Sequence, residues 1–239
     1  MPFFIMGNGS NLLVSDRGFG GAIIKTSGCR DLHFDGNKVY VQSGVLLSAL
    51  ANEALKHSLS GLEFAAGIPG SLGGAICMNA GAYGESMQNV VKRVEFISPG
   101  CEIFSSDEHD FSYRNSVYQK ENKTVVSAVI ELFHGDYEQI KSKMQQLAAR
   151  RREKQPLNFP SAGSVFRRPD GFFAGKLIED CGLKGYTIGG ACVSEKHAGF
   201  IVNKNNASFG DVTSLIQHIR DSVYEKFGVT LQTEIKILE

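Results

Sequence analysis

The sequence lacks the excess of positive charge that a general nucleic-acid binder usually carries. It has 25 lysines and arginines against 25 aspartates and glutamates in 239 residues, so its formal net charge at pH 7 is zero. Proteins that bind nucleic acid over a broad surface are usually basic. We therefore expect no nucleic acid among its partners, although a local basic patch that binds a small phosphorylated ligand is compatible with this balance.

Long hydrophobic runs are also missing. A membrane-spanning helix needs about 20 consecutive apolar residues, and no run in the sequence approaches that length. The first residues do not show the pattern of a secretory signal peptide. We expect no membrane partner, and a chain of this length forms one large domain or two modest ones.

The cysteines and histidines do not show the spacing of a disulfide framework or a metal site. None of the five cysteines belongs to a C-x-x-C pair, and none of the six histidines belongs to an H-x-x-x-H pair. An odd number of scattered cysteines argues against disulfides and indicates a reducing cytoplasm. We expect no metal.

Glycine, by contrast, is abundant and clustered. There are 27 glycines in 239 residues, which is above the ordinary share of about 7%. GNGSN, at residues 7–11, predicts either an ordinary hairpin turn or a loop whose N–H groups and side chains bind a pyrophosphate. The longer cluster, at residues 61–84, predicts a short helix that opens near Gly70 and binds an anion at its N-terminus. Tight packing of this helix against a sheet would explain two or three of its glycines.

The remaining sequence alternates strand-like and helix-like segments, which predicts an α+β fold. Helices are predicted where apolar residues recur three and four apart, and strands where short apolar runs stand between turn residues. The predicted helices cover residues 46–57, 136–155, 172–182 and 212–227, and the predicted strands include residues 22–26, 38–44, 91–98 and 124–133. Asp136 caps the second helix and Pro156 ends it, so we expect two domains, residues 1–155 and residues 156–239.

The last segment, VTLQTEIKIL at residues 229–238, predicts a final strand. Its alternation places Leu231 and Ile235 on one face and Glu234 on the other. A glutamate on the face away from the core is most often exposed to solvent.

The segment PSAGSVFRRP, at residues 160–169, places Ser164 after small residues and before a stiff apolar pair. Taken alone, Ser164 is most simply a turn serine that bonds its own backbone. A hydrolase nucleophile is a poorer interpretation, because AGSVF does not match G-x-S-x-G and no histidine–acid pair has an evident place.

Taken in order, six motifs resemble one known family. They are GNGSNLLVSD, GLEFAAGIPGSLGGAICMNAGAYG, FSYRNSVY, PSAGSVFRRP, GGACVSEKHAGFIVN and TEIKIL. Together they span essentially the whole chain and resemble the UDP-N-acetylenolpyruvoylglucosamine reductases (MurB), and within them the shorter type II branch. The resemblance implies an FAD-binding domain of the vanillyl-alcohol oxidase type, followed by an α+β substrate-binding domain.

The resemblance also implies where FAD would bind. In this family an N-terminal lobe that precedes GNGSNLL supplies part of the FAD site, and we expect the present chain to lack that lobe and to bind FAD more weakly. The implied flavin contacts are Gly7, Asn8, Gly9, Ser10, Asn11, Gly67, Ser71, Gly73, Gly74 and Gly81.

The implied reaction reduces UDP-N-acetylglucosamine enolpyruvate to UDP-N-acetylmuramate in peptidoglycan precursor synthesis. NADPH reduces FAD, and the UDP-sugar then takes a hydride at its vinyl CH2 carbon. By resemblance, Ser164 donates the proton to the neighbouring carbon, while Arg114 and Glu234 stabilise the enolate. The implied substrate-binding residues are Tyr113, Arg168, His197 and Asn203. Arg168 departs from the asparagine of type I enzymes. We expect a monomer.

Two other functions are compatible with parts of the sequence. An oxidase on the same FAD fold would require covalent flavin attachment at a cysteine or histidine, and only Cys77 lies within the longer glycine cluster. A non-catalytic protein that binds a nucleotide-sugar is the second alternative, because part of the flavin site is expected to be missing. A yellow purified protein would separate the flavoenzymes from the non-catalytic protein.

Overall fold

The structure is a computed structural model that describes residues 1–239, and it divides into two units. Unit 1 comprises Met1–Gly9 and Gly21–Arg151, and unit 2 comprises Ser10–Gly20 and Arg152–Glu239. The sequence predicted a single boundary between residues 155 and 156. The two compact units meet within the last turn of helix α4 (Tyr137–Lys154), a few residues before that boundary, and Ser10–Gly20 belongs to the C-terminal unit.

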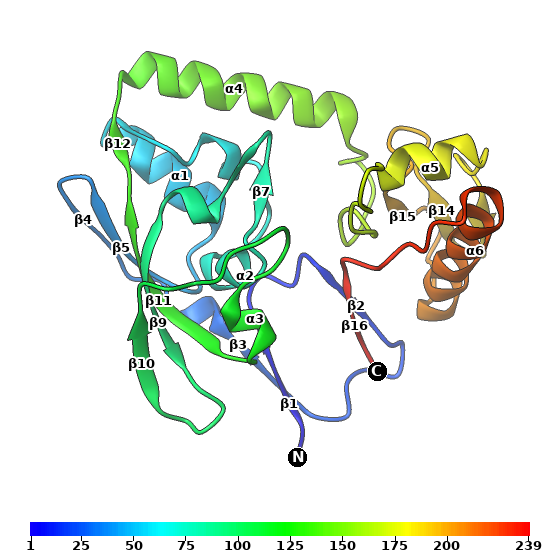
Figure 1. Cartoon of the computed structure of the whole chain (residues 1–239), viewed down its shortest axis with the longest axis horizontal. Coiled ribbons are helices and arrows are strands. Elements are labelled where there is room, and N and C mark those ends of the chain that lie inside the picture. Colours follow the sequence, from blue (N-terminus) through cyan, green and yellow to red (C-terminus); the bar gives the residue numbers. More distant parts are fainter. The chain divides into compact units, whose positions relative to one another are not determined.

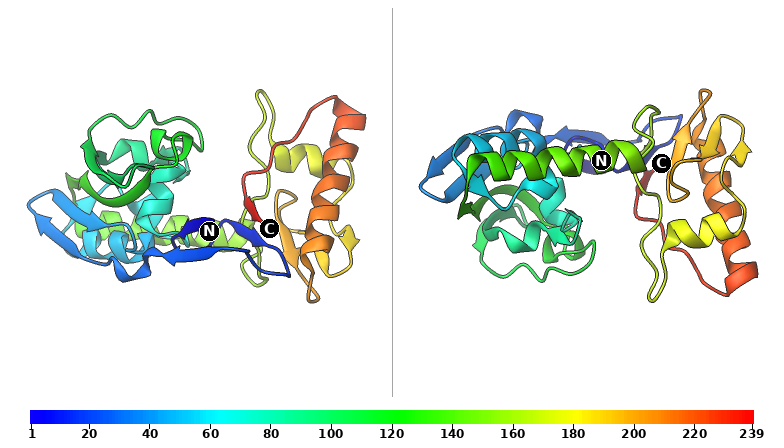
Figure 2. Two further views of the ribbon diagram at one scale, coloured as in Figure 1. Left: turned by 90° about the horizontal axis from the view of Figure 1, so that it is seen from below. Right: turned by 90° about the horizontal axis from the view of Figure 1, so that it is seen from above.

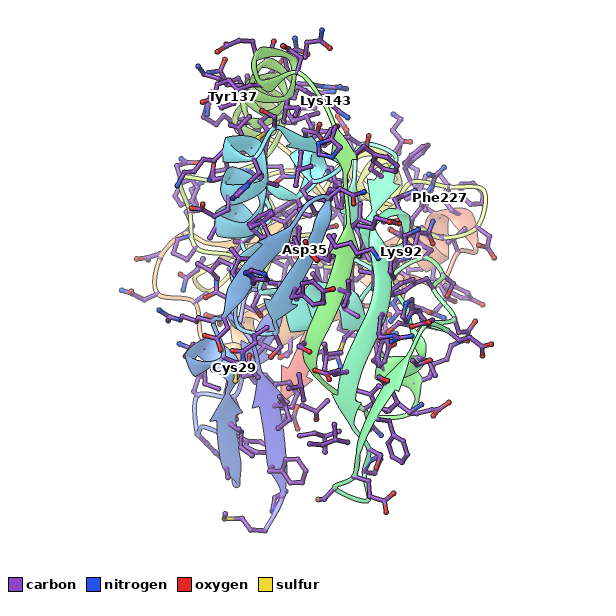
Figure 3. The ribbon with its side chains drawn as sticks, turned by 90° about the vertical axis from the view of Figure 1, so that its left-hand side faces the viewer. Cys29, Asp35, Lys92, Tyr137, Lys143 and Phe227 are labelled. Atoms are coloured by element: carbon purple, nitrogen blue, oxygen red, sulfur yellow. The ribbon has the colours of Figure 1, made fainter.

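Unit 1 is built on a five-stranded antiparallel sheet with the strand order β10-β9-β11-β5-β4 (Figure 1). The strands are β4 Leu32–Asp35, β5 Lys38–Gln42, β9 Val91–Ile97, β10 Ile103–Ser106 and β11 Thr124–Glu131. In β5, Val39 and Val41 are buried whereas Tyr40 between them is exposed. This alternation is typical of a sheet with one face in the core and the other in solvent. Figure 3 shows the solvent face, with Asp35 and Lys92 at its surface.

The buried face of this sheet shares one core with two helices, α1 (Leu47–Lys56) and α2 (Leu72–Cys77). Leu47, Leu50 and Ile76 are fully buried in it. The smaller elements of unit 1 are β1 Phe3–Met6, β3 Ala22–Lys25, η1 Thr26–Gly28, β6 Leu59–Ser60, η2 Glu63–Ala65, β7 Gly81–Ala82, β8 Glu85–Ser86, η3 Met87–Asn89, α3 Val117–Lys120 and β12 Phe133–His134.

Helix α4 confirms the predicted cap. The Asp136 carboxylate accepts a hydrogen bond from the Gln139 N–H (2.9 Å), which satisfies one of the free donors of the first turn. Ile140 is buried, and Lys143 on the same helix pairs with Glu85 at 3.0 Å.

Unit 2 has a core of its own, formed by helices α5 (Ala174–Asp180) and α6 (Phe209–Phe227) and a three-stranded antiparallel sheet. The strands of that sheet are β13 Thr187–Ile188, β14 Ala191–Val193 and β15 Ile201–Asn203. Figure 2 shows α6 running alongside this sheet. The Ser208 hydroxyl accepts from the Asp211 N–H (3.0 Å) at the start of α6, and Gly228 ends the helix at φ 68°.

The final strand is shorter than the sequence predicted. Only β16 (Lys236–Leu238) is regular, and it pairs in parallel with β2 (Leu12–Val14). Before it, Thr233 forms an isolated antiparallel bridge with Phe166. The segment therefore changes partners along its length, so it is not one continuous strand, and Ile237 is 39% exposed.

None of the helices combines the length and the apolar character that crossing a membrane requires.

Candidate functional site

In unit 1 the two glycine-rich stretches approach each other. A Cβ atom on Gly7 would overlap the Ser71 Oγ, so a larger residue at position 7 would force the Ser71 hydroxyl to turn away. The Asn8 side-chain amide donates to the Pro69 carbonyl at 2.6 Å. Gly9 has a φ of 73°, in the left-handed region, but residues 7–11 do not form a hairpin turn, one of the two predictions, because β1 pairs with β3 and β2 pairs with β16. Residues 7–9 and 67–74 therefore form one surface of backbone and small side chains.

Ser71 lies at the centre of that approach. It is 3% exposed, and its Oγ has no hydrogen-bond partner within the protein. Although Ser71 is the N-cap of α2, its side chain makes no capping bond. A buried hydroxyl without a partner costs about 1–3 kcal/mol, so the Ser71 hydroxyl fits a role in binding a polar ligand. A flavin nucleotide, rich in hydroxyl and phosphate groups, is such a ligand.

The other glycines of the longer cluster differ in their surroundings. A Cβ on Gly73 would lie 2.8 Å from the Ser43 Cβ, and one on Gly81 would lie 2.7 Å from the Ser86 Cβ. Packing within unit 1 thus requires glycine at both positions. A Cβ on Gly67 would meet only the flexible Arg151 side chain, and one on Gly74 would meet nothing within 4 Å. Gly74 is exposed, so a side chain there would extend into open space.

Two of the predicted flavin contacts, Ser10 and Asn11, belong to unit 2. The Asn11 side-chain amide donates to the Glu234 carbonyl at 3.2 Å, and the Lys236 N–H donates to the Asn11 carbonyl at 3.0 Å. The structure thus brings Asn11 to Glu234, a contact that spans most of the sequence and that no local pattern indicated.

Arg114 lies in unit 1, at the turn between Ser112 and Asn115. Its φ is 55°, a left-handed conformation that costs an arginine about 1–2 kcal/mol. Its guanidinium donates to the Gly81 carbonyl at 3.2 Å and lies 5.3 Å from the centre of the Tyr113 ring. Tyr113 itself is 55% exposed.

In unit 2, Ser164 and Glu234 lie on neighbouring extended segments. Ser164 forms an antiparallel bridge with Phe200, and the Val165 N–H donates to the Gly199 carbonyl at 2.9 Å. On the other side, the Glu234 N–H donates to the Val165 carbonyl at 2.7 Å. The structure therefore places Glu234 opposite Val165, the residue that follows Ser164, and Glu234 is half-buried instead of fully in solvent.

His197 lies close to Ser164 across Gly199. A Cβ on Gly199 would be 3.0 Å from the His197 ring and 3.4 Å from the Ser164 Oγ. The His197 Nδ1 accepts from the Gly199 N–H at 3.1 Å, which leaves the proton of the neutral ring on Nε2. Burial lowers the pKa of His197, so the ring is held neutral. Sequence reasoning did not single out Gly199, whose only signal was its place in HAGF beside His197.

The two other predicted substrate-binding residues are engaged in local structure. The Arg168 guanidinium stacks on the Phe173 ring at 3.9 Å and donates to the Phe172 carbonyl at 3.3 Å. The Asn203 side-chain oxygen accepts from the Ala207 N–H at 2.9 Å, which closes the turn before α6. No group of three or more histidine, cysteine, aspartate or glutamate side chains is placed to hold a metal ion.

Comparison with known proteins places this chain in a family. A family model described as an FAD binding domain matches residues 1–106, and a model described as the C-terminal domain of UDP-N-acetylenolpyruvoylglucosamine reductase matches residues 155–238. The chain is 56% identical over 240 residues to the UDP-N-acetylenolpyruvoylglucosamine reductase of Caldanaerobacter subterraneus, covering 100% of this chain and 80% of that protein. It is 49% identical to that of Clostridium perfringens, covering 100% and 79%.

A solved structure agrees with these matches. The crystal structure of UDP-N-acetylenolpyruvylglucosamine reductase (MurB) from Thermus caldophilus superposes with a TM-score of 0.86 at 33% identity, covering 100% of this chain and 86% of that one. The predicted fold class, an FAD-binding domain followed by an α+β domain, is confirmed. The chain belongs to the UDP-N-acetylenolpyruvoylglucosamine reductase family of flavin-dependent oxidoreductases.

Proposed function

We propose that this chain reduces the enolpyruvyl ether of UDP-N-acetylglucosamine to the lactyl ether, with FAD as its cofactor and NADPH as the hydride donor. The observation that carries the proposal is that Ser164 and Glu234 lie on adjacent extended segments of unit 2, which the 2.7 Å bond from the Glu234 N–H to the carbonyl of Val165, the residue after Ser164, joins. A proton donor and a hydrogen-bonding carboxyl group are the two functions that the reaction requires of such neighbours.

The flavin residues of unit 1 supply binding and orientation. Ser71 offers its buried, unpaired hydroxyl to the cofactor, while Gly7 and Gly9 allow the backbone to approach it closely. Asn8 holds the loop of Pro69 in place. When bound and reduced, FAD supplies the hydride that the vinyl CH2 carbon of the substrate accepts.

The substrate then develops negative charge on its carboxylate as an enolate. Arg114 presents a planar guanidinium, which suits bidentate contact with a carboxylate. Glu234 stabilises the same group through hydrogen bonding. Stabilisation of developing charge by preorganised groups is usually the largest single contribution to catalysis.

Ser164 donates a proton to the carbon next to the hydride acceptor, which completes the reduction. A serine hydroxyl is a weak acid in water, so it needs a polar group behind it. The neutral His197 ring, across Gly199 from the Ser164 Oγ, supplies an N–H donor in the same part of unit 2. Tyr113, Arg168, His197 and Asn203 are proposed to bind the UDP-sugar.

We propose residues 1–155 as the FAD-binding domain and residues 156–239 as the substrate-binding domain, supported by the family matches at residues 1–106 and 155–238. We also propose a cytoplasmic monomer that does not bind nucleic acid. The balanced charge and the five free cysteines support this proposal.

The test separates the two halves of the reaction by stopped-flow absorbance. NADPH should bleach the FAD of the purified protein, and the enolpyruvyl substrate should restore its colour under anaerobic conditions. In Ser164→Ala, bleaching should stay near the native rate, whereas recovery should slow about 10²–10⁴-fold because a positioned acid is lost.

Ser161→Ala is the matched control, since Ser161 is an exposed serine of the same loop whose Oγ accepts from the Gly163 N–H. It should leave both halves unchanged. If substrate restored the flavin colour of Ser164→Ala at the native rate, Ser164 would be an ordinary loop serine with no part in the reaction. A protein that binds the UDP-sugar but takes up no FAD would instead be a non-catalytic nucleotide-sugar binder.

A further inference from the structure

The turn that carries Arg114 is a strained segment of unit 1. Asp110 and Arg114 both have left-handed backbone conformations, with φ values of 45° and 55°. Such conformations persist in non-glycine residues only when the surrounding structure fixes them.

Asn79 fixes one end of it. Asn79 is 5% exposed, and its side-chain amide donates to the Ser112 carbonyl at 3.0 Å and to the Gln88 Oε1 at 3.2 Å. Its Oδ1 accepts from the Gln88 N–H at 3.0 Å. The Gln88 N–H can bind only the side-chain oxygen of Asn79, and the Ser112 carbonyl can bind only its NH2 group, so the orientation of the amide is fixed. Asn79 thus holds the Ser112 carbonyl with a side chain that has no freedom to turn.

Ser116 fixes the other end. It is fully buried, and its hydroxyl donates to the Cys77 carbonyl at 2.7 Å. Cys77 is the last residue of α2, and Asn79 follows it by two positions. Both ends of the Arg114 turn, Ser112 and Ser116, are therefore tied to the C-terminal end of one short helix.

The N-terminal end of the same helix begins at Ser71, in the proposed flavin loop. Helix α2 has only six residues, so its two ends are joined by a short, hydrogen-bonded spacer with a fixed length. A displacement of Ser112 and Ser116 relative to Ser71 therefore requires either that α2 distorts or that the Asn79 and Ser116 bonds break. The Arg114 guanidinium is held further by its bond to the Gly81 carbonyl.

We propose that Asn79 is a positioning residue for the reaction: through the Ser112 carbonyl it sets the place of the Arg114 guanidinium relative to the flavin loop. Asn79 touches neither substrate nor flavin in this role and acts only through the turn. The role of Arg114 belongs to the proposed function, and the proposal rests on it.

Two substitutions at residue 79 test the proposal. Asn79→Ala removes the bond to Ser112, and Asn79→Asp keeps the size but places a carboxylate oxygen against a carbonyl. We expect recovery of the flavin colour by substrate to slow about threefold to tenfold in Asn79→Ala, because only one of the three hydrogen bonds that it loses, the bond to the Ser112 carbonyl, bears on the Arg114 turn. Recovery should slow more in Asn79→Asp. Bleaching by NADPH should change much less than recovery.

A double-mutant cycle distinguishes positioning from general damage. In an Arg114→Ala background, Asn79→Ala should cause no further slowing of recovery, because the two residues act through one contact. Asn37→Ala is the matched control, since Asn37 donates to the Leu132 carbonyl at 2.9 Å elsewhere in unit 1. Asn37→Ala should not alter the ratio between the rate of flavin bleaching and the rate of colour recovery.

The proposal would be overturned if the effects of Asn79→Ala and Arg114→Ala on recovery multiplied in the double variant. It would also be overturned if Asn79→Ala slowed bleaching and recovery equally. Should Asn79→Ala fail to fold, Ser116→Ala breaks the second tie and carries the same expectation. Amide hydrogen exchange across residues 111–116 provides a readout that does not need activity. Faster exchange there in Asn79→Ala, relative to Asn37→Ala, supports positioning even if the proposed reaction fails, and unchanged exchange contradicts it.

Discussion

The two units hold their proposed catalytic side chains by different means. In unit 1, Arg114 lies on a strained turn that side chains support, chiefly through the bonds of Asn79 and Ser116 to backbone carbonyls. In unit 2, Ser164 and Glu234 lie on extended segments that backbone N–H and carbonyl groups join directly.

This difference determines which substitutions each unit tolerates. A backbone ladder uses groups that every residue except proline possesses, so most side-chain changes leave it intact. A turn held by side chains depends on the identity of each supporting residue. We therefore expect the supporting residues to be sensitive in unit 1, and in unit 2 we expect sensitivity where the backbone itself approaches closely, as at Gly199.

Among the substitutions that test this comparison, the largest effect is expected at Arg114 itself. Arg114→Lys keeps the positive charge but loses the planar, two-pronged contact with a carboxylate. Recovery of flavin colour by the enolpyruvyl substrate should slow about 10²-fold, the usual effect of losing one stabiliser of developing charge. Bleaching by NADPH should remain near the native rate, and stopped-flow absorbance measures both.

Arg93→Lys is the matched control for this change. Arg93 makes a comparable two-pronged contact with Asp107, at 2.6 and 2.9 Å, on the solvent face of the unit 1 sheet. Its replacement should leave both half-reactions intact. If the flavin colour of Arg114→Lys recovered at the native rate, the guanidinium would have only a structural role. Unit 1 would then hold no catalytic side chain to compare with those of unit 2.

A smaller effect is expected from Gly199→Ala in unit 2. The added methyl group would lie 3.0 Å from the His197 ring and 3.4 Å from the Ser164 Oγ, so one of them must shift by a few tenths of an ångström. Small misplacements of reacting groups are costly, and we expect recovery to slow about tenfold. Bleaching by NADPH should be unaffected.

Gly210→Ala controls for the added methyl group in the same unit. Gly210 is within α6, and a Cβ there would meet only the Ser208 Oγ at 3.7 Å, an ordinary contact. This change should stabilise the helix by up to about 1 kcal/mol and leave the kinetics unchanged. If substrate restored the flavin colour of Gly199→Ala at the native rate, the close approach of the Gly199 backbone to His197 and Ser164 would not be what positions Ser164.

The elements that the sequence predicted well are those with local signals. Helix α6 (Phe209–Phe227) was predicted over residues 212–227, and its end is right because the left-handed turn at Gly228 acts within a few residues. Its start lies three residues earlier, after the Ser208 cap, which the prediction did not include. The broken final strand could not be predicted, because its partners, Phe166 and β2, are remote in sequence and nothing near residue 233 marks the change.

The candidate site divides in the same way. Motif resemblance named Arg114, Ser164 and Glu234, because reactive side chains stand within recognisable stretches. Their supports were not predicted. Asn79 holds Ser112 from 33 positions away, and Asn11 holds Glu234 from 223 positions away. Such contacts form only when the chain has folded, so no periodicity or local spacing in the sequence predicts them.

The smallest effect concerns pH and one histidine in each unit. Burial lowers the pKa of His109 in unit 1 and of His197 in unit 2 below the ordinary value of 6.5. The unfolded chain therefore takes up protons below about pH 6.5 that the folded chain does not. The free energy of unfolding should be fully retained above that pH and should fall as pH drops through the lower folded pKa, by at most about 1.4 kcal/mol per pH unit for each histidine.

Urea unfolding at several pH values between 5 and 8, followed by amide exchange in each unit, measures this dependence. His109 is buried and shares a 2.6 Å hydrogen bond with the Tyr118 hydroxyl, so His109→Gln should flatten the pH dependence in unit 1 and leave that of unit 2 as it was. His134→Gln, at an exposed position of unit 1, should change neither.

Stability that stayed constant or rose as the pH fell from 7 to 5 would contradict the expectation, because protons would then not favour the unfolded chain. Loss of the slope in both units on changing His109 alone would show that the two cores unfold as one, and the comparison between them would then apply only to the site and not to stability.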